Sequence, residues 1–258
     1  MNGVVLSEKR SRVHWLTLNR PERKNALDRE TILTLRDQLV ESGKETETRV
    51  VVITGAGRAF CSGADLRSGQ SEKAPANENL LEEGFNATIR ALWGLPKPVI
   101  AAVDGVAAGF GCSLALGADL RLASTTAQFA LLFIKRGLTL DGGASYFLPR
   151  LAGMRRIEMA LTGDMVNAEE ALRIGLVNRV VAESEFQSHV AAYAERLAKN
   201  APLALAAIKA SIQRALTSNL DDTLTWEMKE QRRMNKTEDF REGVAAFLEK
   251  REPVYKGK

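Results

Sequence analysis

Apolar β-branched runs alternate with helical patterns in the first half of the chain. Alternation of apolar and polar positions predicts two strands joined by a polar, hairpin-like connection near the start. The expected strands lie at residues 4–6, 13–18, 50–54, 100–103, 120–123 and 128–130. Apolar residues at helical spacing predict helices over 28–42, with Asp28 as N-cap, and over 80–93. Strand, strand and helix recur in this order, which indicates stacked turns of a spiral.

Beyond Leu131 the pattern becomes helical and strand signals are scarce. The expected helices lie at residues 154–161, 168–174, 184–198, 202–216, 221–234 and 238–250. Large apolar residues are available as packing anchors in the last two, namely Trp226, Met228, Phe240, Phe247 and Leu248. We therefore expect a core over 1–198 and a helical region over 199–258. That region packs either against other subunits or onto its own core.

Two glycine-rich stretches each follow a strand run, one at 55–66 and one at 104–116. Strand, turn and helix in this order point backbone N–H groups at an empty position, because the first turn of a helix leaves its amides unpaired. Gly109 and Gly111 lack a Cβ atom where something approaches the chain closely. Two such turns can supply two hydrogen-bond donors to one oxyanion. The alternative is that the glycines only let a helix pack tightly on a strand.

The composition is typical of a soluble globular protein of 258 residues, with 45% hydrophobic and 26% charged residues. No apolar run approaches the ~18 residues of a membrane span. The first twelve residues are polar, so we expect no secretion signal and a cytoplasmic protein. The final Lys256-Gly257-Lys258 is not a peroxisomal address.

Several classes of function are poorly supported. The net charge is +4, but 32 acidic residues are mixed among 36 basic ones without a basic, aromatic stripe, so we expect no nucleic-acid partner. His14 and His189 lie far apart, and no metal site is expected. Cys61 and Cys112 are expected to be buried, reduced thiols. Ser62 lacks the context of a nucleophilic serine.

The stretch 59–66, followed by 104–112, resembles the crotonase (enoyl-CoA hydratase/isomerase) superfamily. Similar agreement is found in further motifs, at residues 20–27, 161–164, 175–177 and 249–251. The similarity spans essentially the whole chain and its motifs occur in the family's order. It implies an α/β fold, the crotonase spiral of ββα units, and a C-terminal helical region that packs between subunits. A homotrimer, or a hexamer made of two trimers, is the expected assembly.

The resemblance also implies the core of a catalytic site. It assigns the amides of Ala64 and Phe110 to an oxyanion hole for the carbonyl of an acyl-CoA thioester, with no cofactor beyond the CoA of the substrate. A thioester that loses a proton becomes an enolate, and two fixed donors favour that charge. Phe110 stands where many relatives have a glycine, so its ring is expected to lie near the acyl pocket and reshape it.

The carboxylates depart from the hydratase pattern. Enoyl-CoA hydratases of this family use two glutamates, at positions that match Ser113 and Phe133 here. Neither residue moves a proton at neutral pH, so we expect a poor hydratase. Asp141 matches the aspartate of dienoyl-CoA and epoxyphenylacetyl-CoA isomerases, and the stretches 129–138 and 146–150 resemble the latter group. One carboxylate that removes a proton from one carbon and returns it to another would shift a double bond.

Alternatives remain for this residue and for the activity. Leu131, Leu132 and Phe133 are expected to desolvate Asp141 and raise its pKa. Without a catalytic role, Asp141 would cap a helix beginning at Gly142. The other activities are a hydratase of low activity, a non-catalytic acyl-CoA binder, and a chlorobenzoyl-CoA dehalogenase. The last would need a tryptophan in place of Phe133 and a histidine beside the ring.

For the CoA moiety, the resemblance places Arg23 and Lys24 near the phosphates. The rest of the expected CoA site is Ala26, Ser62, Ala64, Asp65 and Leu66. Lys250 is expected to reach the CoA of a neighbouring subunit, although a solvated side chain is the plainer alternative. A polar stretch over 70–79 is expected to form a mobile loop, of the kind that closes over active sites.

Overall fold

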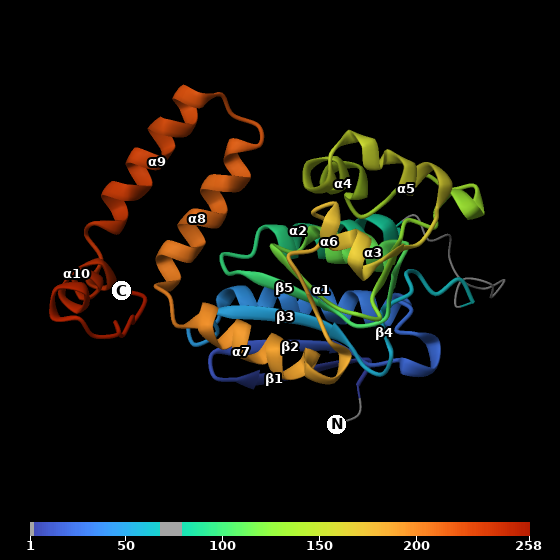
Figure 1. The fold of residues 1–258 in the computed structure, drawn as a ribbon, viewed down its shortest axis with the longest axis horizontal. Helices are drawn as coiled ribbons and strands as arrows, with labels where there is room; N and C mark the ends of the chain where they lie inside the picture. Colours follow the sequence, from blue (N-terminus) through green and yellow to red (C-terminus); the bar gives the residue numbers. More distant parts are fainter. Residues whose placement is uncertain (1–2, 68–78) are drawn as a thin grey trace.

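The structure is a computed structural model that describes residues 3–67 and 79–258. Two sheets form its centre, one with the order β1-β2-β3-β5-β7-β10 and one with the order β4-β6-β8-β9 (Figure 1). The strands are β1 Val5–Arg10, β2 Val13–Leu18, β3 Val50–Gly55, β4 Ala59–Cys61, β5 Val99–Val103, β6 Val106–Ala108, β7 Leu120–Ser124, β8 Gln128–Ala130, β9 Val166–Asn167 and β10 Arg179–Val181. Pairing is antiparallel for β1 with β2 and for β8 with β9, and parallel elsewhere.

Successive strands alternate between the two sheets, so that β3, β5 and β7 enter the larger and β4, β6 and β8 the smaller. Helices separate these pairs of strands. The α-helices are α1 Arg29–Lys44, α2 Ala87–Trp93, α3 Phe110–Gly117, α4 Ala144–Ala152, α5 Ile157–Thr162, α6 Ala168–Arg173, α7 Phe186–Ala198, α8 Pro202–Ala215, α9 Leu220–Met234 and α10 Glu238–Glu249. A π-helix, Leu80–Asn86, precedes α2, and 3₁₀ turns lie at Pro21–Arg23, Ile134–Arg136, Met154–Arg156 and Glu183–Glu185. The predicted α/β fold with repeated ββα units is confirmed.

The central strands of the larger sheet are buried on both faces. Along β3, Val51 and Ile53 point into the main core, whereas Val50 and Val52 pack with the apolar side of α7. Phe186 and Val190 of α7 belong to this second cluster. A parallel strand covered on both faces needs apolar residues at every position, which accounts for the continuous Val-Ile run in the sequence.

The structure corrects several sequence-based boundaries. The segment expected to turn directly into the central helix first forms β6, because Val106–Ala108 pairs with β8. The helix expected to end at Gly43 continues to Lys44, with Asp28 as the predicted N-cap. Strands β9 and β10 lie where strand signals were scarce. The predicted loop at 70–79 lies, apart from Asn79, outside the described residues.

Helices α8, α9 and α10 extend to one side of the sheets (Figure 1). We call residues 199–258 the C-terminal arm; the division of the chain at residue 198 stays a prediction. Lys209 of α8 fastens the arm to the core, because its Nζ lies 2.7 Å from Asp119 Oδ2. Four of the five side chains expected as anchors are exposed, with Phe247 at 81% and Leu248 at 72%, whereas Trp226 is half-buried and donates to Ser211 Oγ. Within the described ranges, no helix has the length and apolar character of a membrane span.

Candidate functional site

The two glycine turns meet at the amino end of α3. A Cβ atom on Gly63 would lie 2.9 Å from the carbonyl oxygen of Ala108 and 3.3 Å from the amide nitrogen of Phe110. A Cβ atom on Gly111 would overlap the Cys61 carbonyl group. The glycines therefore do let α3 pack tightly against the other turn, and this packing also brings the backbone on either side of Gly63 next to Phe110.

This contact places the amides of Ala64 and Phe110 in adjoining turns. The neighbouring amides form hydrogen bonds within the fold. Gly109 N donates to Ala130 O and Asp65 N donates to Leu27 O, each at a distance of 2.9 Å. Among the hydrogen bonds of the described residues, the amides of Ala64 and Phe110 are not used as donors. Phe110 is the first residue of α3, where the helix dipole favours negative charge. The structure brings the two predicted residues together; their role as an oxyanion hole stays a prediction.

The ring of Phe110 does not line an open pocket, contrary to expectation. It is 1% exposed and packs edge-on against Phe85, with the ring centroids 4.6 Å apart. A position at the start of a helix can present its amide on one side and its side chain on the other. The benzyl group therefore belongs to the core.

Asp141 lies in the segment between β8 and α4 and carries an unusual carboxylate. Its Oδ1 is buried and has no hydrogen-bond partner within residues 3–67 and 79–258. Burial raises the pKa of Asp141 to about 6, in the predicted direction. The capping alternative is wrong, because α4 begins at Ala144 behind Gly143 and has no side-chain cap. Buried polar atoms nearly always have a partner, so an orphaned carboxylate oxygen marks a place for a ligand or a proton.

The turn that carries Asp141 packs against α3. A Cβ atom on Gly142 would lie 2.8 Å from ring atoms of Phe110 and 2.8 Å from Ser113 Cβ. Residue 142 therefore contacts the same helical turn that supplies the Phe110 amide. The turns of Asp141, Phe110 and Ala64 are thus linked by successive contacts, although they come from three segments far apart in the sequence.

The predicted CoA residues come together on two neighbouring segments. Ser62 N donates to Lys24 O at 3.0 Å, and Leu27 N donates to Gly63 O at 2.8 Å. The segment 24–27 therefore runs beside 62–65. Arg23 and Lys24 are exposed, so their charges are accessible to an anion. The remaining predicted residues on these segments are Ala26, Ala64, Asp65 and Leu66.

Sequence reasoning missed two residues that organise this region. The Arg20 guanidinium donates to Ala26 O at 2.6 Å and to Asp65 Oδ2 at 2.9 Å. Asn25, with a positive φ of 56°, donates to the carbonyl oxygens of Ala56 and Ala59 and so ties the loop to the first glycine turn. Burial raises the pKa of Asp65, but the bonds from Arg20 and the amide of Arg67 outweigh it and leave this pKa below its usual value. The tolerance of asparagine for positive φ was the available signal for Asn25.

Lys250 lies apart from these residues within one chain. It follows α10 in the C-terminal arm, far from α3 and β4 (Figure 1). Its contact with a neighbour's CoA stays a prediction.

Each of the two glycine-rich stretches contains one cysteine. Cys61 and Cys112 are free and buried, as predicted, and burial raises the pKa of both thiols to about 12. The two histidines belong to other elements, since His14 bonds Ser7 and Ser42 at the larger sheet and His189 is part of α7. Across the described ranges, no group of three His, Cys, Asp or Glu side chains is placed to hold a metal ion.

Comparison with known proteins identifies the family of this chain. Residues 8–258 match the family described as enoyl-CoA hydratase/isomerase. The 1,2-epoxyphenylacetyl-CoA isomerase of Escherichia coli K12 is 40% identical, with both chains covered completely. The short-chain-enoyl-CoA hydratase of Clostridium acetobutylicum is 36% identical over 97% of this chain and 96% of the relative.

Solved structures of the same family have a closely similar fold. The crystal structure of enoyl-CoA hydratase from Bacillus anthracis superposes with a TM-score of 0.92 at 34% identity, covering 99% of this chain and all of that one. The family match over residues 8–258 includes both glycine turns, Asp141 and the C-terminal arm. The chain belongs to the enoyl-CoA hydratase/isomerase family, within the crotonase superfamily.

Proposed function

We propose that this protein isomerises acyl-CoA thioesters by shifting a double bond through an enolate. The Asp141 carboxylate removes a proton from one carbon of the acyl chain. The electron pair moves onto the thioester oxygen, which accepts hydrogen bonds from the amides of Ala64 and Phe110. Asp141, whose newly acquired proton can exchange with solvent, then returns a proton to a different carbon, and the carbonyl group reforms. No oxidant, metal or water molecule is consumed.

The observation that carries this proposal is the unpartnered carboxylate oxygen of Asp141. With a pKa of about 6, Asp141 is ionised near neutral pH yet holds a proton far better than an exposed aspartate. A proton shuttle must be ionised to remove the proton in the first step, and it must then hold a proton until the second step. Hydration would require a second group to activate water, and the residues at the two hydratase glutamate positions are Ser113 and Phe133.

The names of the relatives do not decide between isomerase and hydratase, because both occur among them. The test is therefore chemical. Wild-type protein and the Asp141→Asn variant are incubated in D₂O with 3-enoyl-CoA and ring-containing acyl-CoA thioesters, and products are separated and weighed by mass spectrometry.

An isomerase yields products of unchanged carbon and oxygen content and new retention times, with deuterium at the carbon that Asp141 reprotonates. A hydratase adds the mass of one water, and a binder gives no exchange. Full isomerase activity in the Asp141→Asn variant would contradict the proposal.

We further propose that CoA binds along the paired segments 24–27 and 62–65, with Arg23 and Lys24 facing its phosphates. Exposed cations without a fixed geometry act through charge, so Arg23→Ala and Lys24→Ala should raise KM and leave kcat unchanged. Lys44→Ala, an exposed lysine on α1, is the matched control. Ala26, Ser62, Ala64, Asp65 and Leu66 complete the proposed site, and Lys250 is proposed to serve a neighbouring subunit.

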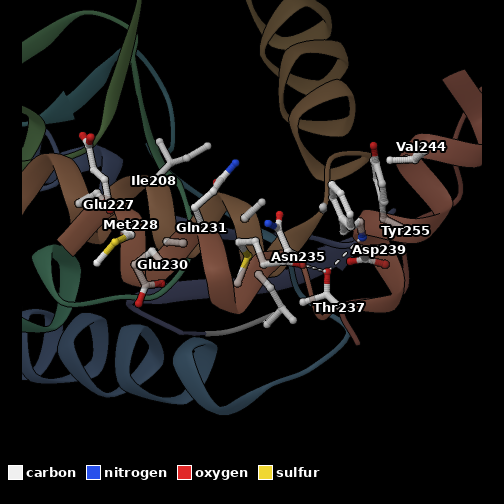
Figure 2. A pocket seen from close by; sticks show the side chains of 18 of the residues that line it. Ile208, Glu227, Met228, Glu230, Gln231, Asn235, Thr237, Asp239, Val244 and Tyr255 are labelled. Carbon is white, nitrogen blue, oxygen red and sulfur yellow. Dashed lines mark hydrogen bonds between the residues drawn. The ribbon is translucent and has the colours of Figure 1, made fainter. Parts of the chain in front are cut away.

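The proposed assembly is a homotrimer or a hexamer of two trimers. It is supported by an apolar groove of about 1000 Å³ between α8, α9 and α10. Figure 2 shows Ile208 of α8 and Met228 of α9 along this groove, with Val244 and Tyr255 at its α10 end. An apolar surface of this extent marks a contact with another chain, here a second copy. Light scattering should show the assembly, and Phe247→Glu should dissociate it. The cytoplasmic location stays a prediction.

A further inference from the structure

We infer that Ser113 is a positioning residue for catalysis: its hydroxyl holds the turn of Asp141 against α3 and so sets where the carboxylate stands relative to the oxyanion amides. The inference rests on the proposed function, in which Asp141 is the proton shuttle. It gives a role to the residue that occupies a glutamate position of the hydratases.

The first observation is the direction of the Ser113 hydroxyl. Its Oγ lies 3.0 Å from the carbonyl oxygen of Asp141 and 3.5 Å from that of Gly109. A hydroxyl has one proton to donate, and the shorter distance identifies Asp141 as its acceptor. Ala144 N donates to the same carbonyl over 3.1 Å. The backbone of Asp141 is therefore held from α3 on one side and from α4 on the other.

The second observation is the tight packing beside this bond. Gly142, with a φ of +57°, has no room for a Cβ atom, since Ser113 Cβ and the Phe110 ring would each lie 2.8 Å away. Ser113 itself is completely buried. The turn can therefore approach α3 only in a narrow range of positions, and the hydroxyl bond selects one of them.

The third observation explains why this bond matters. No hydrogen bond among the described residues holds the carboxylate of Asp141, and its Oδ1 is buried without a partner. The hydrogen bonds that position this residue are therefore those made by its backbone. Phe110 N–H and Ser113 Oγ belong to the same helix, three residues apart, so one rigid element positions both the oxyanion donor and the base.

Ser113 is not itself a proton carrier. A serine hydroxyl does not ionise at neutral pH, and its single proton is already donated to a backbone carbonyl. Its effect on the reaction is therefore geometric. Displacement of a reacting group by about 1 Å can cost on the order of 100-fold in rate.

The test compares Ser113→Ala with wild type, using steady-state kinetics on the substrate identified for the isomerase and a pH profile of kcat. Ser42→Ala is the matched control, because Ser42 Oγ also donates to a backbone carbonyl, that of Gln38, from a buried site on α1. We expect kcat of Ser113→Ala to fall about tenfold with KM unchanged. We also expect the acidic midpoint of its pH profile to move below that of wild type, because a loosened carboxylate is better hydrated.

Ser113→Cys provides a second variant of nearly the same size with a weaker donor, and it should show the same changes to a smaller extent. Wild-type kcat and midpoint in both variants would overturn the inference, as would a loss of activity that Ser42→Ala reproduces. Asp141→Asn is measured in parallel. If it is inactive while the Ser113 variants behave as wild type, only this inference fails; if it is fully active, the proposed function fails as well.

Discussion

The amide nitrogen of Phe110 lies 3.3 Å from the position that a Cβ atom on Gly63 would occupy. The backbone of Gly63 has a φ of +97°, and the Ala108 carbonyl oxygen lies on the same side at 2.9 Å. A side chain at residue 63 would therefore push the two turns apart. Because the Ala64 amide follows directly, the spacing of the two unpaired donors depends on a missing methyl group.

We predict that Gly63→Ala lowers kcat by about 100-fold, the usual cost of losing one oxyanion donor. Gly137→Ala is the control, because Gly137 also has a positive φ, +65°, but no atom lies within 4 Å of a Cβ there. Both variants incur backbone strain of about 1 kcal/mol. Kinetics and thermal unfolding on both separate the two effects. Equal kcat values for the two variants would show that the contact at Gly63 does not shape the site.

The rate of isomerisation should depend on the ionisation of Asp141. Burial raises the pKa of Asp141 to about 6, and the proposed first step needs the ionised carboxylate. We therefore predict that kcat/KM rises with pH through about 6 and is flat from there to about pH 8. The measurement is a pH profile with a substrate that has no ionisable group in this range. A rate that falls as the pH passes 6 would mean that the reactive form is the protonated acid.

The elements that could be predicted are those whose own residues determine them. The Val-Ile run of β3 is buried on both faces, and Asp28 accepts from Thr31 N at the start of α1. Strands β4 and β6 could not be predicted in the same way. Each has three residues, shorter than a clear alternation, and β6 pairs with β4 on one side and β8 on the other. Their pairing is a property of the tertiary fold.

The residues of the candidate site could be predicted from the sequence, but their orientation could not. Glycine spacing and family resemblance indicated Ala64, Phe110 and Asp141, but not which way their side chains face. The Phe110 ring turns into the core because Phe85, distant in sequence, provides an edge-on partner. Without the family resemblance, the sequence favoured capping by Asp141, and the start of α4 behind Gly143, without a side-chain cap, excludes it. The partner of Ser113 lies 28 residues away, beyond the reach of any local pattern.

The attachment of the C-terminal arm should depend on the buried pair of Lys209 and Asp119. Burial lowers the pKa of Lys209 and raises that of Asp119, yet their side chains lie 2.7 Å apart and neutralise each other. Lys209→Met would leave Asp119 without its partner, so we predict a loss of about 3 kcal/mol in the free energy of unfolding.

The double variant Lys209→Met/Asp119→Asn should recover part of this loss, because no uncompensated charge remains. Asparagine retains an acceptor for Val99 N, which now donates to Asp119 Oδ2 over 2.8 Å. Urea unfolding of the two single variants and the double variant measures the coupling. Strictly additive losses would show that the pair does not fasten the arm.

Asp141 should lower the stability of the fold while it serves the reaction. Its pKa is higher in the folded chain, about 6, than the ordinary value of 3.8, so the native state binds its proton more tightly than the unfolded state does. The cost of burying the charge is therefore absent below the ordinary pKa, grows as the pH rises between the two values, and is complete above 6.

We predict that Asp141→Asn unfolds at higher urea concentration than wild type at pH 8, and that this advantage shrinks towards pH 4. A shift of this size corresponds to at most about 3 kcal/mol, and the partial exposure of the carboxylate reduces the expected gain to about 1–2 kcal/mol. Glu47→Gln, an exposed carboxylate before β3, is the control and should show no such trend. An advantage that grows as the pH falls would mean that the buried carboxylate stabilises the fold, and the assignment of Asp141 as a desolvated base would fail with it.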